Sequence, residues 1–157
     1  HPEIPKNILD SYARICGAVM KGLANIGIES RYMPINDIIV NKKKISGNAQ
    51  TRKLKTVLQH GTVLTDVDVD KMFSVLKVPN EKIKDKMISD VKQRVTSVKH
   101  ILGEKLEFDN LLNEKKKGFE EEFEISLVKD NLTSEEEILT KKFEREYFDS
   151  KEWNHRR

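Results

Sequence analysis

A long apolar stripe near the N-terminus constrains the fold more than any other feature. Between Ile8 and Ile26, apolar residues recur every three or four positions, which is the spacing of one helix face. Pro5 suits the entrance of such a helix, and Gly27 suits the position at which a left-handed residue ends it. The stripe consists of Ile8, Leu9, Tyr12, Ile15, Cys16, Val19, Met20 and Leu23. A stripe of this length needs a sheet to cover it.

The next segments read as strands. Residues 29–46 carry β-forming residues on both sides of a turn near Asn41 and Lys42. Residues 57–65 are β-branched and apolar, which predicts a central strand. The short charged segment 51–55 predicts a hairpin connection between them. We therefore expect three antiparallel strands after the first helix.

The second half of the chain is mainly helical. Asp68 suits the N-cap of a short helix ending near Leu76, and Asn80 suits the N-cap of another. Residues 108–123 predict a helix, and residues 124–128 predict a brief strand. The stripe of the former comprises Phe108, Leu111, Leu112, Phe119 and Phe123.

A capping box at Thr133–Glu136 predicts a closing helix. Its apolar residues Ile138, Phe143 and Tyr147 are expected to point inward. The order α-βββ-αα-α-β-α predicts an α+β fold, a sheet flanked by helices. Three strands and a brief fourth are few for a chain of this length, so we expect further strands, absent from this chain, to complete the sheet.

The composition of the chain limits the classes of function that it can have. The chain has 157 residues, which suits one domain or part of one, and no apolar run approaches the roughly 18 residues of a membrane span. Its net charge is +3, with basic and acidic residues interspersed, which disfavours nucleic-acid binding. The single cysteine, Cys16, has no internal disulfide partner, so a reduced, cytoplasmic setting is expected.

Residues 41–64 combine lysines, small residues and an apolar run broken by His60 and Gly61. Strand alternation predicts that Lys44 points away from Lys43. Small residues let a ligand approach the backbone, and a lysine beside them supplies a charge for a phosphate or carboxylate. A solvated lysine cluster before a β-bulge, with a core histidine, explains the same residues, so residue chemistry alone leaves both interpretations open.

Several separated motifs resemble the lipoate–protein ligase family of the biotin and lipoate protein ligase superfamily. They are "IND" at 35–37, "KKISGNAQTR" at 43–52, "LQHGTVL" at 58–64, "GFEEEFEI" at 118–125 and the ending "LTSEEEILTKKFEREYFDSKEWNHRR". The resemblance covers residues 8–157 in the expected order. It implies a biotin/lipoate protein ligase-like mixed sheet flanked by helices.

The resemblance also implies an activity. Members activate lipoate with ATP and Mg²⁺ to lipoyl-AMP and pass the lipoyl group to a lysine of a carrier domain. Lys44, which directly precedes Ile-Ser-Gly, matches the family's catalytic lysine. Asp37 is expected to face the nucleotide or its Mg²⁺. The residues expected to shape the nucleotide pocket are Gly47, Asn48 and Ala49, with His60 and Gly61 at its floor.

One departure from the family bears on completeness. The family's triple-glycine signature lies upstream of such a first helix, and this chain has no Gly-Gly. The chain, 1–157, is therefore expected to be the C-terminal part of one catalytic domain, without an accessory domain and inactive alone. The implied partners are the N-terminal portion with the triple-glycine motif and a lipoyl carrier domain, from a 2-oxoacid dehydrogenase E2 or the glycine cleavage H protein. A separate accessory-domain protein is a further implied partner, whereas nucleic acid and membrane are not.

Two alternatives stay open. Octanoyl- and lipoyl-transferases share the "GNAQTR…LQHG" pattern and need no ATP, but they use a cysteine nucleophile just before the Asn-Asp strand. The corresponding stretch, 30–37, has no cysteine, and Cys16 lies on the apolar stripe of the first helix. This difference favours the ligase. The second alternative is a non-catalytic basic binding module.

Overall fold

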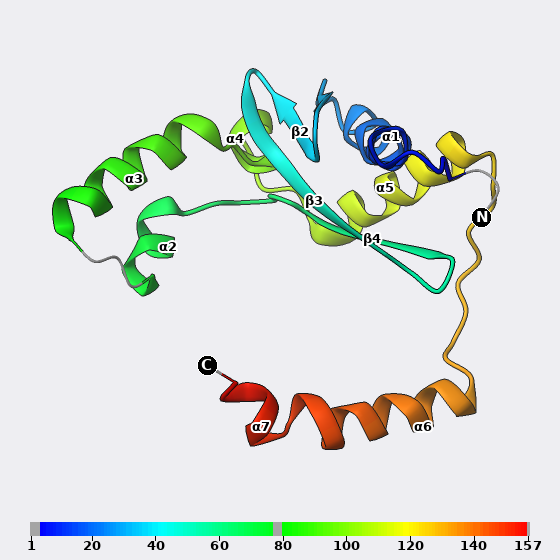
Figure 1. Ribbon diagram of the computed structural model, residues 1–157. Coiled ribbons are helices and arrows are strands. Elements are labelled where there is room, and N and C mark those ends of the chain that lie inside the picture. Colours follow the sequence, from blue (N-terminus) through cyan, green and yellow to red (C-terminus); the bar gives the residue numbers. More distant parts are fainter. Residues whose placement is uncertain (1–3, 77–79, 157) are drawn as a thin grey trace. The chain divides into compact units, whose positions relative to one another are not determined.

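The structure is a computed structural model that describes residues 4–76 and 80–156 (Figure 1). The chain divides into two compact units, His1–Ser126 and Leu127–Arg157, which are described separately. The first unit holds the sheet and five of the helices, and the second is a short helical segment.

The predicted first helix is confirmed as α1, Ile8–Ala24. Its N-cap is Asn7, whose side-chain oxygen accepts hydrogen bonds from the backbone N–H groups of Leu9 and Asp10. Asn25 is the C-cap, and Gly27 follows with a φ of +81°, the left-handed conformation expected there.

The sheet has four antiparallel strands in the order β1-β2-β3-β4. They are β1, Arg31–Met33; β2, Asp37–Val40; β3, Lys43–Lys53; and β4, Thr56–Val63. The predicted turn at Asn41–Lys42 joins β2 to β3, and a second turn at Leu54–Lys55 joins β3 to β4. All four turn residues have positive φ, which is the geometry of the tight turns that suit hairpins.

Three strand predictions were wrong. The described residues form four strands after α1 in place of the expected three, because a turn at residues 34–36 divides the first of them. Among the described residues β4 is an edge strand, not the predicted central one, and Leu58 at its middle is exposed. Residues 125–128 form no strand, although they are β-forming. Glu124 ends the preceding helix in a left-handed conformation, with φ of 53°, and no strand of the described residues pairs with the segment that follows.

Four further helices belong to the first unit: α2, Val69–Val75; α3, Glu81–Arg94; α4, Val98–Leu102; and α5, Phe108–Phe123. The predicted cap of α2 is confirmed, because a carboxylate oxygen of Asp68 accepts a hydrogen bond from the N–H of Lys71. The stripe of α5 is only partly buried: Leu111 lies in the core, whereas Phe108 and Leu112 are exposed.

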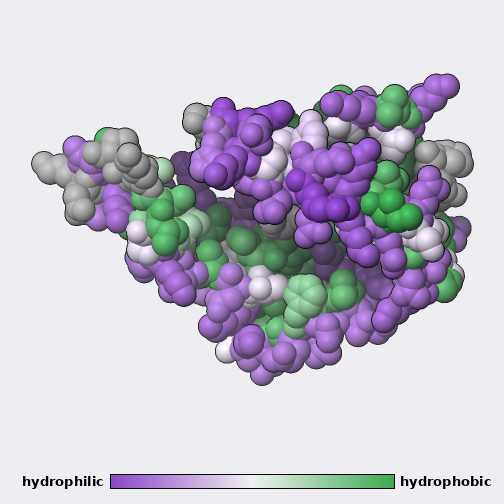
Figure 2. Space-filling model, turned by 90° about the horizontal axis from the view of Figure 1, so that it is seen from below, coloured by the Kyte–Doolittle hydropathy of each residue, from purple (hydrophilic) through white to green (hydrophobic). Residues whose placement is uncertain are grey.

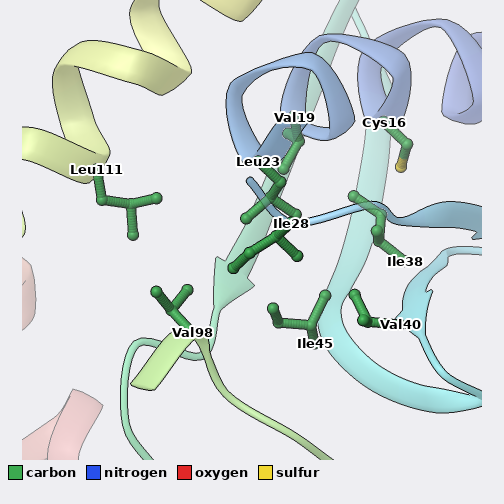
Figure 3. Packing of buried hydrophobic residues seen from close by; sticks show 9 residues of the cluster. All are labelled: Cys16, Val19, Leu23, Ile28, Ile38, Val40, Ile45, Val98 and Leu111. Carbon is green, nitrogen blue, oxygen red and sulfur yellow. The ribbon is translucent and has the colours of Figure 1, made fainter. Parts of the chain in front are cut away.

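The core lies between the sheet and α1 (Figure 3). Its buried members are Cys16, Val19, Leu23, Ile28, Ile38, Val40, Ile45, Val98 and Leu111. Helix α5 packs against α1 through glycines. A Cβ on Gly118 would stand 2.3 Å from the carbonyl oxygen of Ala18, and one on Gly22 would stand 2.7 Å from the Cα of Lys115. The two helices therefore meet backbone to backbone, which a larger side chain at either glycine would prevent.

The second unit contains α6, Ser134–Phe143; a π-helical turn, Glu144–Phe148; and α7, Lys151–Asn154. The capping box of Thr133 and Glu136 is confirmed. The expected inward side chains, Ile138, Phe143 and Tyr147, are exposed in this unit, since a single helical segment has no layer of its own to bury them.

The face of the protein drawn in Figure 2 is mixed in character. Apolar residues interrupt a mainly hydrophilic surface in Figure 2. Among the described residues, no helix has the length and apolar character needed to cross a membrane.

Candidate active site

A β-bulge places three of the predicted site residues on one face of the sheet. Asp37 pairs with Gly47 and Ile39 pairs with Lys44, but the register shifts between Ile38 and Ile39. The extra residue on β3 is Ile45, which points into the core. Lys44 and Gly47 are three residues apart, so regular alternation would send their side positions to opposite faces. The bulge resets this alternation and puts both beside Asp37.

Lys44 and Asp37 form an ion pair on this face. The ammonium Nζ of Lys44 lies 2.6 Å from Oδ1 of Asp37, and both side chains are partly exposed. The lysine side chain lies directly over Gly47, because a Cβ built on that glycine would stand 2.7 Å from Cε and 2.8 Å from Nζ of Lys44. The glycine therefore makes room for the lysine itself. The sequence-based expectation that Gly47 makes room for a nucleotide remains a prediction.

The backbone of Lys44 is held from both sides. Ile39 of β2 pairs with it on one side, and Val95 forms a parallel bridge with it on the other. The N–H of Thr96 donates to the carbonyl oxygen of Lys44 at 2.9 Å. The ammonium group is thus anchored on a fixed strand, as a charge that acts on a bound ligand should be.

The neighbouring Lys43 takes a different direction. Its ammonium donates to the carbonyl oxygen of Lys92, at 3.3 Å, and does not contact Asp37. The prediction that the two lysines point different ways agrees with this arrangement.

Lys44 and Asp37 line a cavity of about 570 Å³ between the sheet and α3. Most of the cavity wall is apolar. Its apolar residues are Met33 and Ile39 on the sheet side, and Met87, Val91 and Val95 on the opposite side. The remaining lining residues are Lys42, Asp90 and Arg94. Sequence reasoning missed the contribution of α3. The spacing of Met87, Val91 and Val95, four residues apart, was the signal that would have found it.

The other predicted site residues divide between the two faces. Ala49 pairs with His60, and strand alternation places both on the face of Gly47. Asn48 pairs with Gly61 and lies on the face toward α1, where its amide donates to the hydroxyl of Ser46. The structure therefore does not bring Asn48 and Gly61 to the side of Lys44.

Packing explains why position 61 is a glycine. A Cβ on it would stand 2.2 Å from Oδ1 of Asn48. Asn48 is buried, and its amide also donates to the carbonyl oxygen of Asn36. This glycine therefore leaves space for a hydrogen-bonded core amide.

The only thiol of the chain is Cys16, which is fully buried in the core. Burial raises the pKa of the Cys16 thiol to about 11, more than the hydrogen bond from Gln59 lowers it. A thiol in this state stays protonated and is a poor nucleophile at neutral pH. The expectation that Cys16 is a core residue is confirmed.

The described residues do not assemble a resident metal site. Asp37, the expected ligand for Mg²⁺, is paired with Lys44. In residues 4–76 and 80–156 no group of three or more histidine, cysteine, aspartate or glutamate side chains is placed to hold a metal ion. We therefore assign no step to a bound Mg²⁺.

Comparison with known proteins decides the family. The family described as the lipoyl protein ligase A/B catalytic domain matches residues 1–120. The chain belongs to this family. The family resemblance seen in the sequence motifs is thereby confirmed, and so is the α+β fold.

Curated relatives carry the name octanoyltransferase LipM. The protein of Brevibacillus brevis is 28% identical and that of Bacillus subtilis is 26% identical, each over 180 residues. Each alignment covers all of this chain and 65% of the relative. The chain thus spans about two thirds of the length of these relatives.

Solved structures of lipoate protein ligases superpose well on this chain. A bipartite lipoate protein ligase of Thermoplasma acidophilum has a TM-score of 0.85 at 29% identity, covering 96% of this chain and 59% of that one. Lipoate-protein ligase A bound with ATP has a TM-score of 0.76 at 26% identity, with 94% and 59% covered. A biotin protein ligase of Aquifex aeolicus, at 18% identity and a TM-score of 0.55 over 78% and 46%, shares the fold alone.

The curated relatives overturn the expectation of an ATP-dependent ligase. They are octanoyltransferases, and a transferase moves an acyl group that is already activated, without ATP. ATP, Mg²⁺ and an acyl-adenylate are therefore not supported for this chain. The preference for the ligase rested on the missing cysteine before β2, which is a weaker ground than whole-chain similarity.

Proposed function

We propose that the chain is part of an acyltransferase that moves an octanoyl group from a thioester to a lysine of a lipoyl carrier domain. The observation that carries the proposal is the Lys44 ammonium at the wall of an apolar cavity of about 570 Å³. An apolar cavity beside a fixed cation suits a fatty acyl group, whose chain is apolar and whose carbonyl oxygen gains negative charge during transfer. The octanoyltransferase relatives support the same substrate class.

Lys44 has the central role in this proposal. When an amine attacks the acyl carbon, negative charge develops on the carbonyl oxygen, and the ammonium of Lys44 stabilises it. Asp37 orients the ammonium through the 2.6 Å ion pair. One preorganised contact of this kind is worth about 3–4 kcal/mol in the transition state, or two to three orders of magnitude in rate.

Covalent catalysis through Cys16 is not part of the proposal. The thiol is buried in the core and its pKa is about 11. A thioester is already an activated ester, so the acceptor lysine attacks it once the amine has lost its proton. The contribution of this chain is then to polarise the carbonyl group, and any thiol nucleophile belongs to another part of the enzyme.

The complete enzyme is proposed to need sequence beyond this chain. The curated relatives are longer, and the triple-glycine motif of the family has no counterpart in residues 1–157. A partner portion carrying that motif, and a lipoyl carrier domain as acceptor, remain proposals. The chain alone is expected to give no turnover.

The test compares two acyl donors with the complete enzyme. Octanoyl-coenzyme A without ATP, and free octanoate with ATP and Mg²⁺, are each incubated with a lipoyl carrier domain, and the mass of the carrier is followed. We expect transfer from the thioester without ATP and its loss in Lys44→Ala. Transfer only from free octanoate with ATP, or turnover by residues 1–157 alone, would overturn the proposal.

A further inference from the structure

Three consecutive lysines on α5 have different surroundings. Lys116 lies 3.7 Å from a carboxylate oxygen of Glu120, and Lys117 lies 2.6 Å from one of Glu114. Lys115 is half-buried and has no carboxylate within ion-pair distance among the described residues. It is therefore the one lysine of the three whose charge is desolvated without compensation.

The helix crossing fixes this environment. The Cα of Lys115 faces Gly22 of α1, where a Cβ would stand only 2.7 Å away. The backbone of Lys115 therefore lies in the close contact between the two helices. From there the residue lines a cavity of about 160 Å³ between α1, α5 and the strands β3 and β4, whose polar residues Ser46, Asn48 and Gln59 line the sheet side.

The cavity is apolar on its helical side. Ile15 and Val19 of α1 and Phe119 of α5 line it together with Lys115. Burial lowers the pKa of the Lys115 ammonium, because no opposite charge offsets the loss of water. More of this amine is neutral at a given pH than of a fully solvated lysine, and the neutral amine is the nucleophilic form.

We propose that Lys115 is a self-acylation site, at which the amine takes the acyl group of a thioester in place of the carrier lysine. The substrate class, a medium-chain acyl thioester, rests on the proposed function. The neutral amine nitrogen bonds to the acyl carbon and the carbon–sulfur bond breaks. The nitrogen loses one proton, the departing thiolate takes one up, and the products are an amide and a free thiol.

The geometry distinguishes this site from ordinary surface acylation. The apolar wall of Ile15, Val19 and Phe119 attracts an acyl chain toward the amine. Lys116 and Lys117 carry the same functional group on the same helix, but each lies beside a glutamate at the exposed surface. They provide internal comparison sites in the same peptide.

The experiment maps acylation in the complete enzyme with octanoyl-coenzyme A as the probe and no carrier domain. Fragmentation mass spectrometry assigns the added octanoyl group among Lys115, Lys116 and Lys117 over time. We expect Lys115 to react at least about fivefold faster than either neighbour. The preference should disappear after unfolding in urea, which removes the cavity and the burial.

Matched variants complete the test. Lys115→Arg should remove most of the incorporation on α5, and Lys116→Arg should leave it nearly unchanged. Equal rates at the three lysines in the folded protein, or no octanoyl group on Lys115, would overturn the proposal. Transfer to the carrier domain is measured separately, so failure of the proposed function would be seen independently of the result at Lys115.

Discussion

Replacing Gly47 by alanine should separate activity from stability. The new Cβ would stand 2.7 Å from Cε and 2.8 Å from Nζ of Lys44, whereas unstrained contacts lie near 3.5–4.0 Å. The ammonium must therefore retreat by about 1 Å. A displacement of that size costs about 100-fold in rate, which corresponds to about 2.7 kcal/mol of transition-state stabilisation.

The stability of Gly47→Ala should change little. The atoms that must move are the end of a flexible, partly exposed side chain. Its ion pair with Asp37 is partly exposed and is worth about 0–1 kcal/mol. We expect kcat/KM for acyl transfer by the complete enzyme to fall about 100-fold, while the midpoint of urea unfolding shifts only slightly.

Gly61→Ala is the matched control on the opposite face. Its Cβ would stand 2.2 Å from Oδ1 of Asn48 and 3.0 Å from the carbonyl oxygen of Gly47. Neither atom moves freely, because Asn48 is buried and hydrogen-bonded, so we expect a loss of about 1–3 kcal/mol in the free energy of unfolding. If Gly47→Ala kept full activity, or destabilised the protein as much as Gly61→Ala, the placement of Lys44 over Gly47 would be refuted.

Three more outcomes are expected. Lys44→Ala should lower kcat about 100- to 1000-fold, while Lys43→Ala should be nearly silent; equal losses in the same transfer assay would contradict the strand geometry. Cys16→Ser should keep its transfer activity and lose about 1–2 kcal/mol of stability in urea unfolding, and in the wild type the thiol should resist iodoacetamide well above pH 8 because its pKa is about 11; loss of transfer in this variant would make the thiol catalytic. Replacing Leu54 by Asn and Lys55 by Gly should raise the free energy of unfolding in urea by about 1 kcal/mol per site, since both residues have positive φ in the β3–β4 turn; an unchanged free energy of unfolding would mean that the turn is unstrained.

The elements that sequence reasoning found are those whose signals are local. The helix over Ile8–Ala24 follows from apolar spacing, and the Thr133 cap from a four-residue pattern, so neither depends on distant contacts. The prediction of a strand at residues 125–128 was wrong because a strand forms only where another strand pairs with it. The β propensity of a segment does not show whether such a partner is present.

The geometry of the candidate site could be predicted only where it depends on local sequence. Lys44 and Asp37 were identified as site residues, and the structure brings them together. A β-bulge after the lysines was considered only in the alternative interpretation, and its position at Ile45 was not predicted. The position depends on how β2 and β3 pair, and this pairing decides which residues share a face. The wall supplied by α3 was missed because it comes from a helix more than forty residues further along the chain.

The glycine crossing of α1 and α5 has a consequence for the order of folding. Gly22 and Gly118 are separated by about 100 residues, so their contact closes one of the longest loops in the first unit. The β2–β3 and β3–β4 hairpins need only neighbouring residues and should form early, whereas α1 finds its final partner late. During synthesis, the face of α1 that carries Ala18 and Gly22 stays uncovered until α5 has emerged, and in that interval it is exposed to contacts with other chains.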